Sequence, residues 1–144
     1  RRGDALPYVN DLVAVGTYVT LKHLLPTGGH DLDRADGDLV LRFATGDEDF
    51  IPLGSTQVER PEAGEVIFAD ARKVLCRRWT WRQADADKMT LDTRDLEMNV
   101  DGLPPATVAD VRLAMAECAE LLCRICSAET RELLLSAETP TIEL

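Results

Sequence analysis

The segment that decides the fold reads Arg72-Lys73-Val74-Leu75-Cys76-Arg77-Arg78-Trp79-Thr80-Trp81-Arg82. Five basic side chains and no acids give it a charge of +5 within a chain of formal net charge −10, so all other residues sum to −15. The segment also holds both tryptophans of the chain. Its apolar and aromatic residues predict a strand from residue 74 to residue 81.

Two interpretations of this strand follow from its residue types. Where arginines alternate with aromatic residues, the arginines can bind phosphates and the rings can stack on bases. Alternatively, the strand is half-buried and its arginines pair with the surrounding carboxylates. The net negative charge of the chain argues against a broad nucleic-acid-binding surface. It does not exclude a local basic groove. We therefore expect no DNA partner.

Size and composition predict one compact α+β domain over residues 1–144. The chain has 144 residues, of which 45% are hydrophobic and 29% charged, as in ordinary globular proteins. No apolar run approaches the roughly 18–20 residues that span a bilayer, so we expect no membrane partner. Reduced cysteine thiols favour a cytoplasmic protein. Because the sequence opens at Arg1 rather than Met, we expect a fragment or a processed form.

The cysteines predict no metal site and no cofactor. Cys123 and Cys126 form a C-x-x-C pair, but a zinc site needs a second pair, and the two histidines lie far away in the sequence. Apolar residues around them recur at steps of three and four, as on one face of a helix. We expect reduced thiols that serve as small hydrophobic side chains.

Periodicity and turn signals predict the elements. A first helix is expected over residues 9–23, ended by Pro26, and is followed by a glycine-rich turn over residues 27–31. Strands are expected at residues 39–44, 50–53, 65–69, 74–81 and 96–100. Thr107, with Asp110 three residues later, is expected to cap a long helix that runs to about residue 127. A short final helix is expected over residues 129–135.

Two segments carry residues suited to chemistry. In Gly28-Gly29-His30-Asp31 the glycines allow close backbone approach, and the histidine can orient water or bind a ribose hydroxyl. The alternative is a tight turn with a surface histidine. In residues 83–94, Asp85 and Thr93 follow the basic strand and can position a nucleophilic water, although a solvated acidic loop is the simpler interpretation.

The order of these landmarks resembles a known family. The landmarks are Leu6-Pro7-x-x-Asn10, Tyr18-Val19-x-Leu21, Pro26-x-x-x-x-Asp31, Arg42-x-Ala44, Ala69-Asp70 and Thr93. They resemble the tRNA-editing domain of the phenylalanyl-tRNA synthetase beta subunit. The turn Gly29 to Asp33 and the strand Cys76 to Gln83 are more similar still to freestanding relatives of that domain. The resemblance covers Leu6 to Gly102, with a looser match through the C-terminal helix.

The resemblance implies an α+β fold, an unusual β-sandwich with flanking helices, and an editing activity. The synthetase domain hydrolyses tyrosine wrongly esterified to phenylalanine tRNA. Carried over by position, its pocket comprises Gly16, Thr17, Gly28, His30, Asp85 and Thr93. Gly28 stands where the family has a histidine, and Asp85 is one methylene shorter than the family's glutamate, so tyrosine specificity is not expected. The freestanding relatives also carry an N-terminal helical segment that is expected to be missing here.

We therefore expect a domain that binds the acceptor end of aminoacyl-tRNA and hydrolyses a mischarged ester in trans. The expected catalytic residues are His30, Asp85 and Thr93. The expected substrate-binding residues are Thr17, Gly28, Gly29, Asp31, Arg77, Arg78, Trp79, Trp81, Arg82 and Gln83. One alternative is a non-catalytic module on the same fold that binds RNA, aminoacyl-tRNA or a small ligand. Another is an interaction subunit whose acidic surface docks a basic partner.

Overall fold

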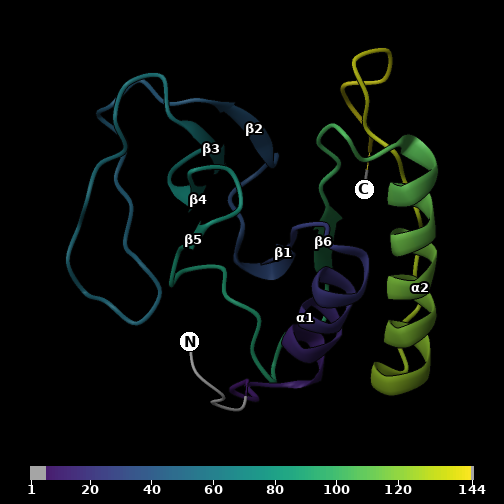
Figure 1. Ribbon diagram of the computed structural model, residues 1–144. Coiled ribbons are helices and arrows are strands. Elements are labelled where there is room, and N and C mark those ends of the chain that lie inside the picture. The colour runs from purple at the N-terminus through teal and green to yellow at the C-terminus, as the bar shows by residue number, and fades with distance from the viewer. Residues whose placement is uncertain (1–5, 144) are drawn as a thin grey trace. The chain divides into compact units, whose positions relative to one another are not determined.

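The computed structural model describes residues 6–143, which form two compact units (Figure 1). One unit spans Pro26–Asn99 and contains nearly all of the strands. The other is formed by the two ends of the chain, up to Leu25 and from Val100, and contains both α-helices. None of the helices in the described chain has the length and apolar content required to span a bilayer.

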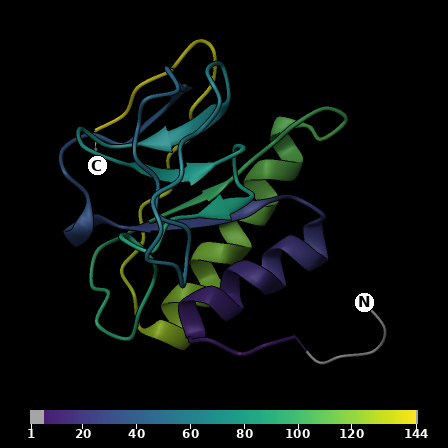
Figure 2. The same ribbon diagram turned by 90° about the vertical axis from the view of Figure 1, so that its left-hand side faces the viewer.

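A four-stranded antiparallel sheet forms the centre of the Pro26–Asn99 unit. Its strands run in the order β2 (Val40–Phe43), β3 (Val66–Ala69), β4 (Val74–Arg77) and β5 (Arg82–Gln83). A separate two-stranded sheet pairs β1 (Thr27–Asp31) with β6 (Leu96–Val100) (Figure 2). The strands predicted at residues 39–44, 65–69 and 96–100 are confirmed, and so is the α+β class.

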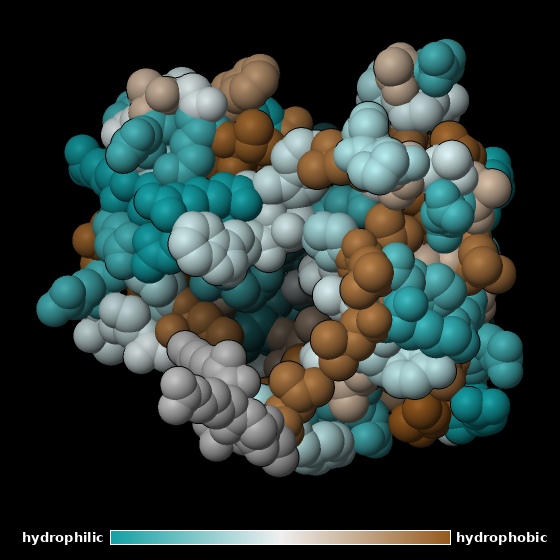
Figure 3. Space-filling view, viewed as in Figure 1, coloured by the Kyte–Doolittle hydropathy of each residue, from teal (hydrophilic) through white to brown (hydrophobic). Residues whose placement is uncertain are grey.

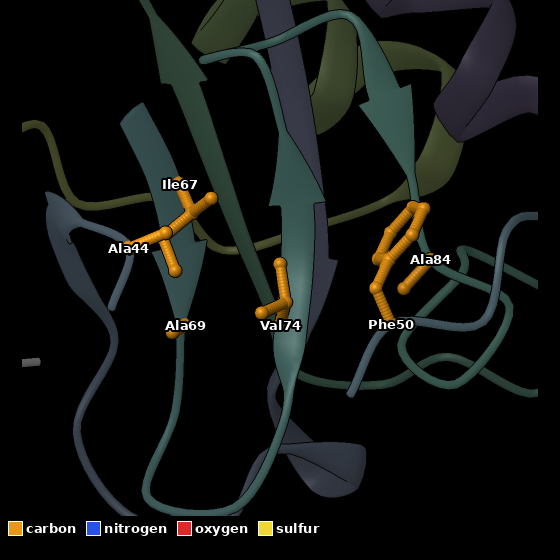
Figure 4. Close-up of a cluster of buried hydrophobic side chains, with 6 residues drawn as sticks. All are labelled: Ala44, Phe50, Ile67, Ala69, Val74 and Ala84. Carbon is orange, nitrogen blue, oxygen red and sulfur yellow. The ribbon is translucent and has the colours of Figure 1, made fainter. Parts of the chain in front are cut away.

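The strand register separates two rows of side chains onto opposite faces of the larger sheet. One row is Arg42, Ile67, Arg77 and Arg82, and the other is Leu41, Phe68, Cys76 and Gln83. Successive residues of a strand point to opposite faces, so these rows have different surroundings. A buried apolar cluster, drawn in Figure 4, consists of Ala44, Phe50, Ile67, Ala69, Val74 and Ala84.

The strand predicted over residues 74–81 is wrong in its second half. β4 ends at Arg77, because Arg78 and Trp79 both adopt left-handed backbone conformations, with φ of 51° and 64°. The chain turns back, and Arg82 pairs with Arg77 across the hairpin. Hairpin turns favour Gly and Asn at such positions, so bulky residues there give no turn signal in the sequence. The strand predicted at residues 50–53 is likewise reduced to two isolated bridges, Phe50 with Glu59 and Pro52 with Ala84.

The glycine-rich turn predicted over residues 27–31 is a strand, β1. A Cβ at Gly29 would lie 3.0 Å from Sδ of Met89 and 3.3 Å from the backbone oxygen of Glu97. The absence of a side chain therefore allows close packing rather than a turn. A consequence is that His30 lies inside the unit and is not the surface residue of the alternative interpretation.

Caps define both helices of the other unit. Asn10 accepts a hydrogen bond from the Val13 N–H at 2.9 Å and begins α1 (Asp11–His23). Thr107 and Asp110 form a reciprocal capping box at the start of α2 (Val108–Cys126). The two predicted helices are confirmed. They pack against each other, and Glu117 of α2 receives hydrogen bonds from Tyr18, Lys22 and His23 of α1.

The final helix predicted over residues 129–135 is wrong. Ser127 adopts a left-handed conformation that ends α2, and residues 129–135 contain no helix. Most of these residues are exposed. A short helix is marginal unless an apolar face packs on the protein, and here little of the segment is packed.

Candidate functional site

The site is built on the row of the larger sheet that contains Phe68 and Gln83. His30, from β1, lies against Phe68, with ring centroids 5.2 Å apart and an interplanar angle of 45°. His30 is only 1% exposed. The imidazole is therefore held in a packed environment rather than free in solvent.

A buried carboxylate, Asp87, links His30 to Gln83. Its Oδ2 is hydrogen-bonded to Nδ1 of His30 and accepts a second hydrogen bond from Nε2 of Gln83 at 3.1 Å. Asp87 is 0% exposed, and its backbone oxygen accepts the N–H of Asp31 at 3.0 Å. The structure thus brings together two predicted site residues through a third that sequence reasoning missed. The only available signal was its place in Asp85-Ala86-Asp87, which does not indicate burial.

Asp31 and Thr93, both predicted site residues, are in contact. The Thr93 hydroxyl donates to Oδ2 of Asp31 at 2.7 Å and accepts the backbone N–H of Thr90 at 2.9 Å. Asp31 also accepts the N–H of Asp33 and lies 3.3 Å from Nε of Arg34. These bonds tie the loop after β5 to the end of β1, next to His30.

Asp85 has different partners. Its Oδ1 accepts the backbone N–H of Gly54 at 3.0 Å and lies 2.8 Å from Nζ of Lys88. The hydrogen bond from Lys88, followed by that from Gly54, lowers the pKa of the Asp85 carboxyl below its usual value. A carboxylate with a lowered pKa is a weak general base and a good hydrogen-bond acceptor.

Arg77 and Arg82 occupy the opposite face of the sheet and are paired with acids. Arg77 bonds to both oxygens of Glu65, at 2.8 and 2.7 Å, and to Glu59 at 3.1 Å. Arg82 bonds to both oxygens of Glu59, at 2.5 and 2.9 Å. Both guanidinium groups lie over the Phe50 ring, 5.6 and 5.5 Å from its centroid. For these two arginines, the structure favours the interpretation of pairing with surrounding carboxylates.

Arg78, Trp79 and Trp81 form the hairpin loop between β4 and β5. The Arg78 guanidinium lies 5.2 Å from the centroid of the Trp81 ring, and Trp81 is 72% exposed. Trp79 is partly buried, and its Nε1 has no hydrogen-bond partner among residues 6–143. The surface of the sheet-bearing unit as a whole is largely hydrophilic in the view of Figure 3, where this unit lies on the left. An exposed arginine stacked on an exposed tryptophan is thus a part of the basic segment that is open to a ligand.

The remaining predicted residues lie on two different elements. Gly28 and Gly29 belong to β1, and a Cβ at Gly28 would come within 2.8 Å of Oδ1 of Asn99. Thr17 belongs to α1 in the helical unit, where its hydroxyl donates to the backbone oxygen of Val13 at 2.8 Å.

The helical unit has a separate cleft of about 320 Å³ between α1 and α2. Its walls are Asp11, Ala14, Val15, Tyr18, Leu121, Arg124 and Ile125. None of these is a predicted site residue.

The four cysteines all lie within the described chain. The four thiols form no disulfide in the described chain, and residues 6–143 contain no group of three His, Cys, Asp or Glu side chains placed to hold a metal ion. Burial raises the pKa of the Cys118 thiol to about 11, which keeps it protonated and a poor nucleophile.

Comparison with known proteins defines the class. The family model of the B3/4 domain matches residues 1–127, so the chain belongs to the B3/4 domain family. Its fold is similar to the crystal structure of an N-terminal fragment of the phenylalanyl-tRNA synthetase beta-subunit from Pyrococcus horikoshii, with a TM-score of 0.63 and 16% sequence identity. The match covers 78% of this chain and 39% of that fragment, so the chain spans well under half of its length. No curated protein matched the sequence. The predicted resemblance to the phenylalanyl-tRNA synthetase beta subunit and the predicted α+β fold class are confirmed.

Proposed function

We propose that this B3/4 domain binds aminoacyl-tRNA and hydrolyses the ester of a mischarged tRNA in trans, in the cytoplasm. The relation to a synthetase domain supports a tRNA substrate. The observation that carries the proposal is the hydrogen-bonded chain from Gln83 through buried Asp87 to His30. A histidine held by a buried carboxylate is a common arrangement for general acid–base chemistry.

The reaction is attack of water on the ester carbonyl between the amino acid and the terminal ribose. His30 takes the proton of the water as it attacks and delivers a proton to the ribose oxygen when the ester C–O bond breaks. The products are the free amino acid and deacylated tRNA. Asp85, with its lowered pKa, acts as an acceptor that orients the water or a ribose hydroxyl rather than as the base.

The other predicted residues have supporting roles in this proposal. Backbone N–H groups of Gly28 and Gly29 are the candidates for holding the developing oxyanion. The bonds between Thr93 and Asp31 keep the loop that carries Asp87 against β1.

The acceptor end of the tRNA binds the hairpin loop in this proposal. The exposed Arg78–Trp81 stack offers a cation for a phosphate and a ring for a base. The indole Nε1 of Trp79 is buried, so a contact from Trp79 to the tRNA would use the rest of its ring. Arg77 and Arg82 contribute indirectly, because their charges are already matched by Glu65 and Glu59.

A non-catalytic binding module is the second candidate. It is favoured by the ion pair of Asp85 with Lys88, which opposes a role in proton transfer, and by the neutralised arginines of the sheet. Such a module binds aminoacyl-tRNA, RNA or a small amino-acid-like ligand without turnover.

The deciding experiment is deacylation of a panel of mischarged, radiolabelled aminoacyl-tRNAs. Wild type is compared with His30→Ala and Asp85→Asn, with His23→Ala and the exposed Asp92→Asn as matched controls. The proposal expects turnover of at least one species and a loss of about 10²-fold or more in His30→Ala. Binding of the same tRNAs without turnover supports the module, and the absence of both binding and turnover contradicts the hydrolase and a module that binds aminoacyl-tRNA.

A further inference from the structure

The carboxylate of Asp87 has a specific relation to the imidazole of His30. We infer that Asp87 is a positioning residue, which fixes His30 with its proton on Nδ1 and so reserves Nε2 for the reacting atoms. The catalytic consequence rests on the proposed function. The tautomer itself does not, because it concerns the hydrogen bonds of Asp87 and no reaction.

The first step of the argument is the direction of the hydrogen bonds at Oδ2 of Asp87. Gln83 approaches this oxygen with its amide nitrogen, which has only hydrogens to give, so the oxygen acts as an acceptor. The same oxygen faces Nδ1 of His30. A carboxylate oxygen accepts from the ring N–H that it faces, so Nδ1 is the donor and carries the proton.

The second step is that neither partner is free to move. The His30 ring is packed on Phe68, and His30 and Asp87 are almost completely buried. Asp87 is anchored through its backbone oxygen to the N–H of Asp31, the residue after His30. Gln83 is fixed by its place opposite Cys76 in the sheet. A rotation of the imidazole would break the bond to a buried carboxylate, so one orientation is favoured.

The third step concerns the other oxygen of the carboxylate. Oδ1 of Asp87 is buried and has no hydrogen-bond partner among residues 6–143. A buried acceptor without a donor is unfavourable for folding. An arrangement that served stability alone would not need a charged group with an unsatisfied oxygen at this place. A carboxylate that accepts from Nδ1 does hold the imidazole ring in one orientation.

The test reads the imidazole directly. The chain has two histidines, so the variant His23→Gln leaves His30 as the one imidazole, and its side-chain ¹H–¹⁵N spectrum can be assigned without ambiguity. At a pH where the ring is neutral, we expect the Nδ1–H tautomer and a downfield, slowly exchanging Nδ1 proton. Adding Asp87→Asn should shift this proton upfield and speed its exchange, whereas Asp92→Asn should leave it unchanged. A proton on Nε2, or a freely exchanging ring before Asp87 is changed, overturns the inference.

Kinetics test the catalytic consequence separately. On an aminoacyl-tRNA that wild type hydrolyses, Asp87→Asn should lower kcat by about 10- to 100-fold with little change in KM. Asp87→Glu should recover part of the loss. An Asp87→Asn protein that folds, is active and keeps the wild-type kcat overturns the positioning role. If wild type hydrolyses no aminoacyl-tRNA but His30 shows the fixed Nδ1–H tautomer, the proposed function fails and the structural assignment stands. If Asp87→Asn does not fold, the spectrum of the His23→Gln protein still decides the tautomer.

Discussion

Arg77 and Glu65 form a two-point ion pair inside the sheet-bearing unit. The Arg77 Nε lies 2.8 Å from one carboxylate oxygen, and its Nη2 lies 2.7 Å from the other. Their side chains are only 6% and 11% exposed. The pair joins the end of β4 to the residue before β3, so it holds the base of the hairpin whose loop carries Arg78 and Trp81.

Removing Arg77 should strongly destabilise the protein. Arg77→Ala leaves the Glu65 carboxylate buried without its partner, which typically lowers the free energy of unfolding by about 3–5 kcal/mol. Arg77→Lys should recover only part of this, because an ammonium group cannot bind both oxygens in the same way. Urea unfolding followed by circular dichroism measures both. Arg72→Ala, at a side chain that is 78% exposed, is the control and should change the free energy by less than about 0.5 kcal/mol.

Because of the same ion pair, the free energy of unfolding should fall as the pH is lowered into the acid range. The hydrogen bond from Arg77 lowers the pKa of the Glu65 carboxyl below its ordinary value. A carboxyl whose pKa is lower in the folded state stabilises the protein above the unfolded pKa, near about 4.3, and loses this contribution as the pH falls towards the folded value. Urea midpoints should therefore drop from roughly pH 5 downwards.

Glu65→Gln is the matched variant for this pH dependence. It should be less stable than wild type at neutral pH and should lose less further stability on acidification. An equal acid dependence in the two proteins would contradict the role of Glu65.

Gly102 and Val111 should behave as a coupled pair within the helical unit. A Cβ at residue 102 would lie 2.4 Å from Cγ2 of Val111, well inside van der Waals contact. Gly102→Ala should lower the free energy of unfolding by about 1–3 kcal/mol through overpacking. In the background of Val111→Ala the same change should have much less effect, because the clashing methyl is gone. Additive effects in this double-mutant cycle would exclude the contact.

Arg78→Gly should separate stability from tRNA binding. Arg78 has a φ of 51°, a conformation that glycine adopts without the steric penalty of a side chain. The variant should be as stable as wild type or more stable by up to about 1 kcal/mol. Under the proposed function it should nevertheless bind tRNA more weakly.

Salt titration measures the binding part of this prediction. Loss of one phosphate contact should reduce the log–log slope of affinity against salt by roughly 0.7. Arg60→Ala, another change at an exposed arginine, is the control and should retain the wild-type slope. Unchanged affinity in Arg78→Gly would remove the hairpin loop from the proposed binding surface.

Local signals account for what could be predicted of the fold. Thr107, with Asp110, marks the start of α2, and alternating apolar residues mark β2 and β6. Asn10, which caps α1, lies inside the helix predicted from residue 9. The hairpin at Arg78 and Trp79 was missed because neither residue is typical of a left-handed turn. The strand through Gly28 and Gly29 was missed because glycine is more common in turns.

The sequence by itself determined the α+β class, both helices and the membership in the B3/4 family, since these depend on caps, periodicity and contiguous motifs. Only the tertiary structure decided which charges meet. His30 is hydrogen-bonded to an aspartate 57 residues away, and the arginines of one basic segment divide between buried ion pairs and an exposed stack. Such pairings depend on strand register and burial, which arise from packing of distant segments, and residue types alone do not specify them.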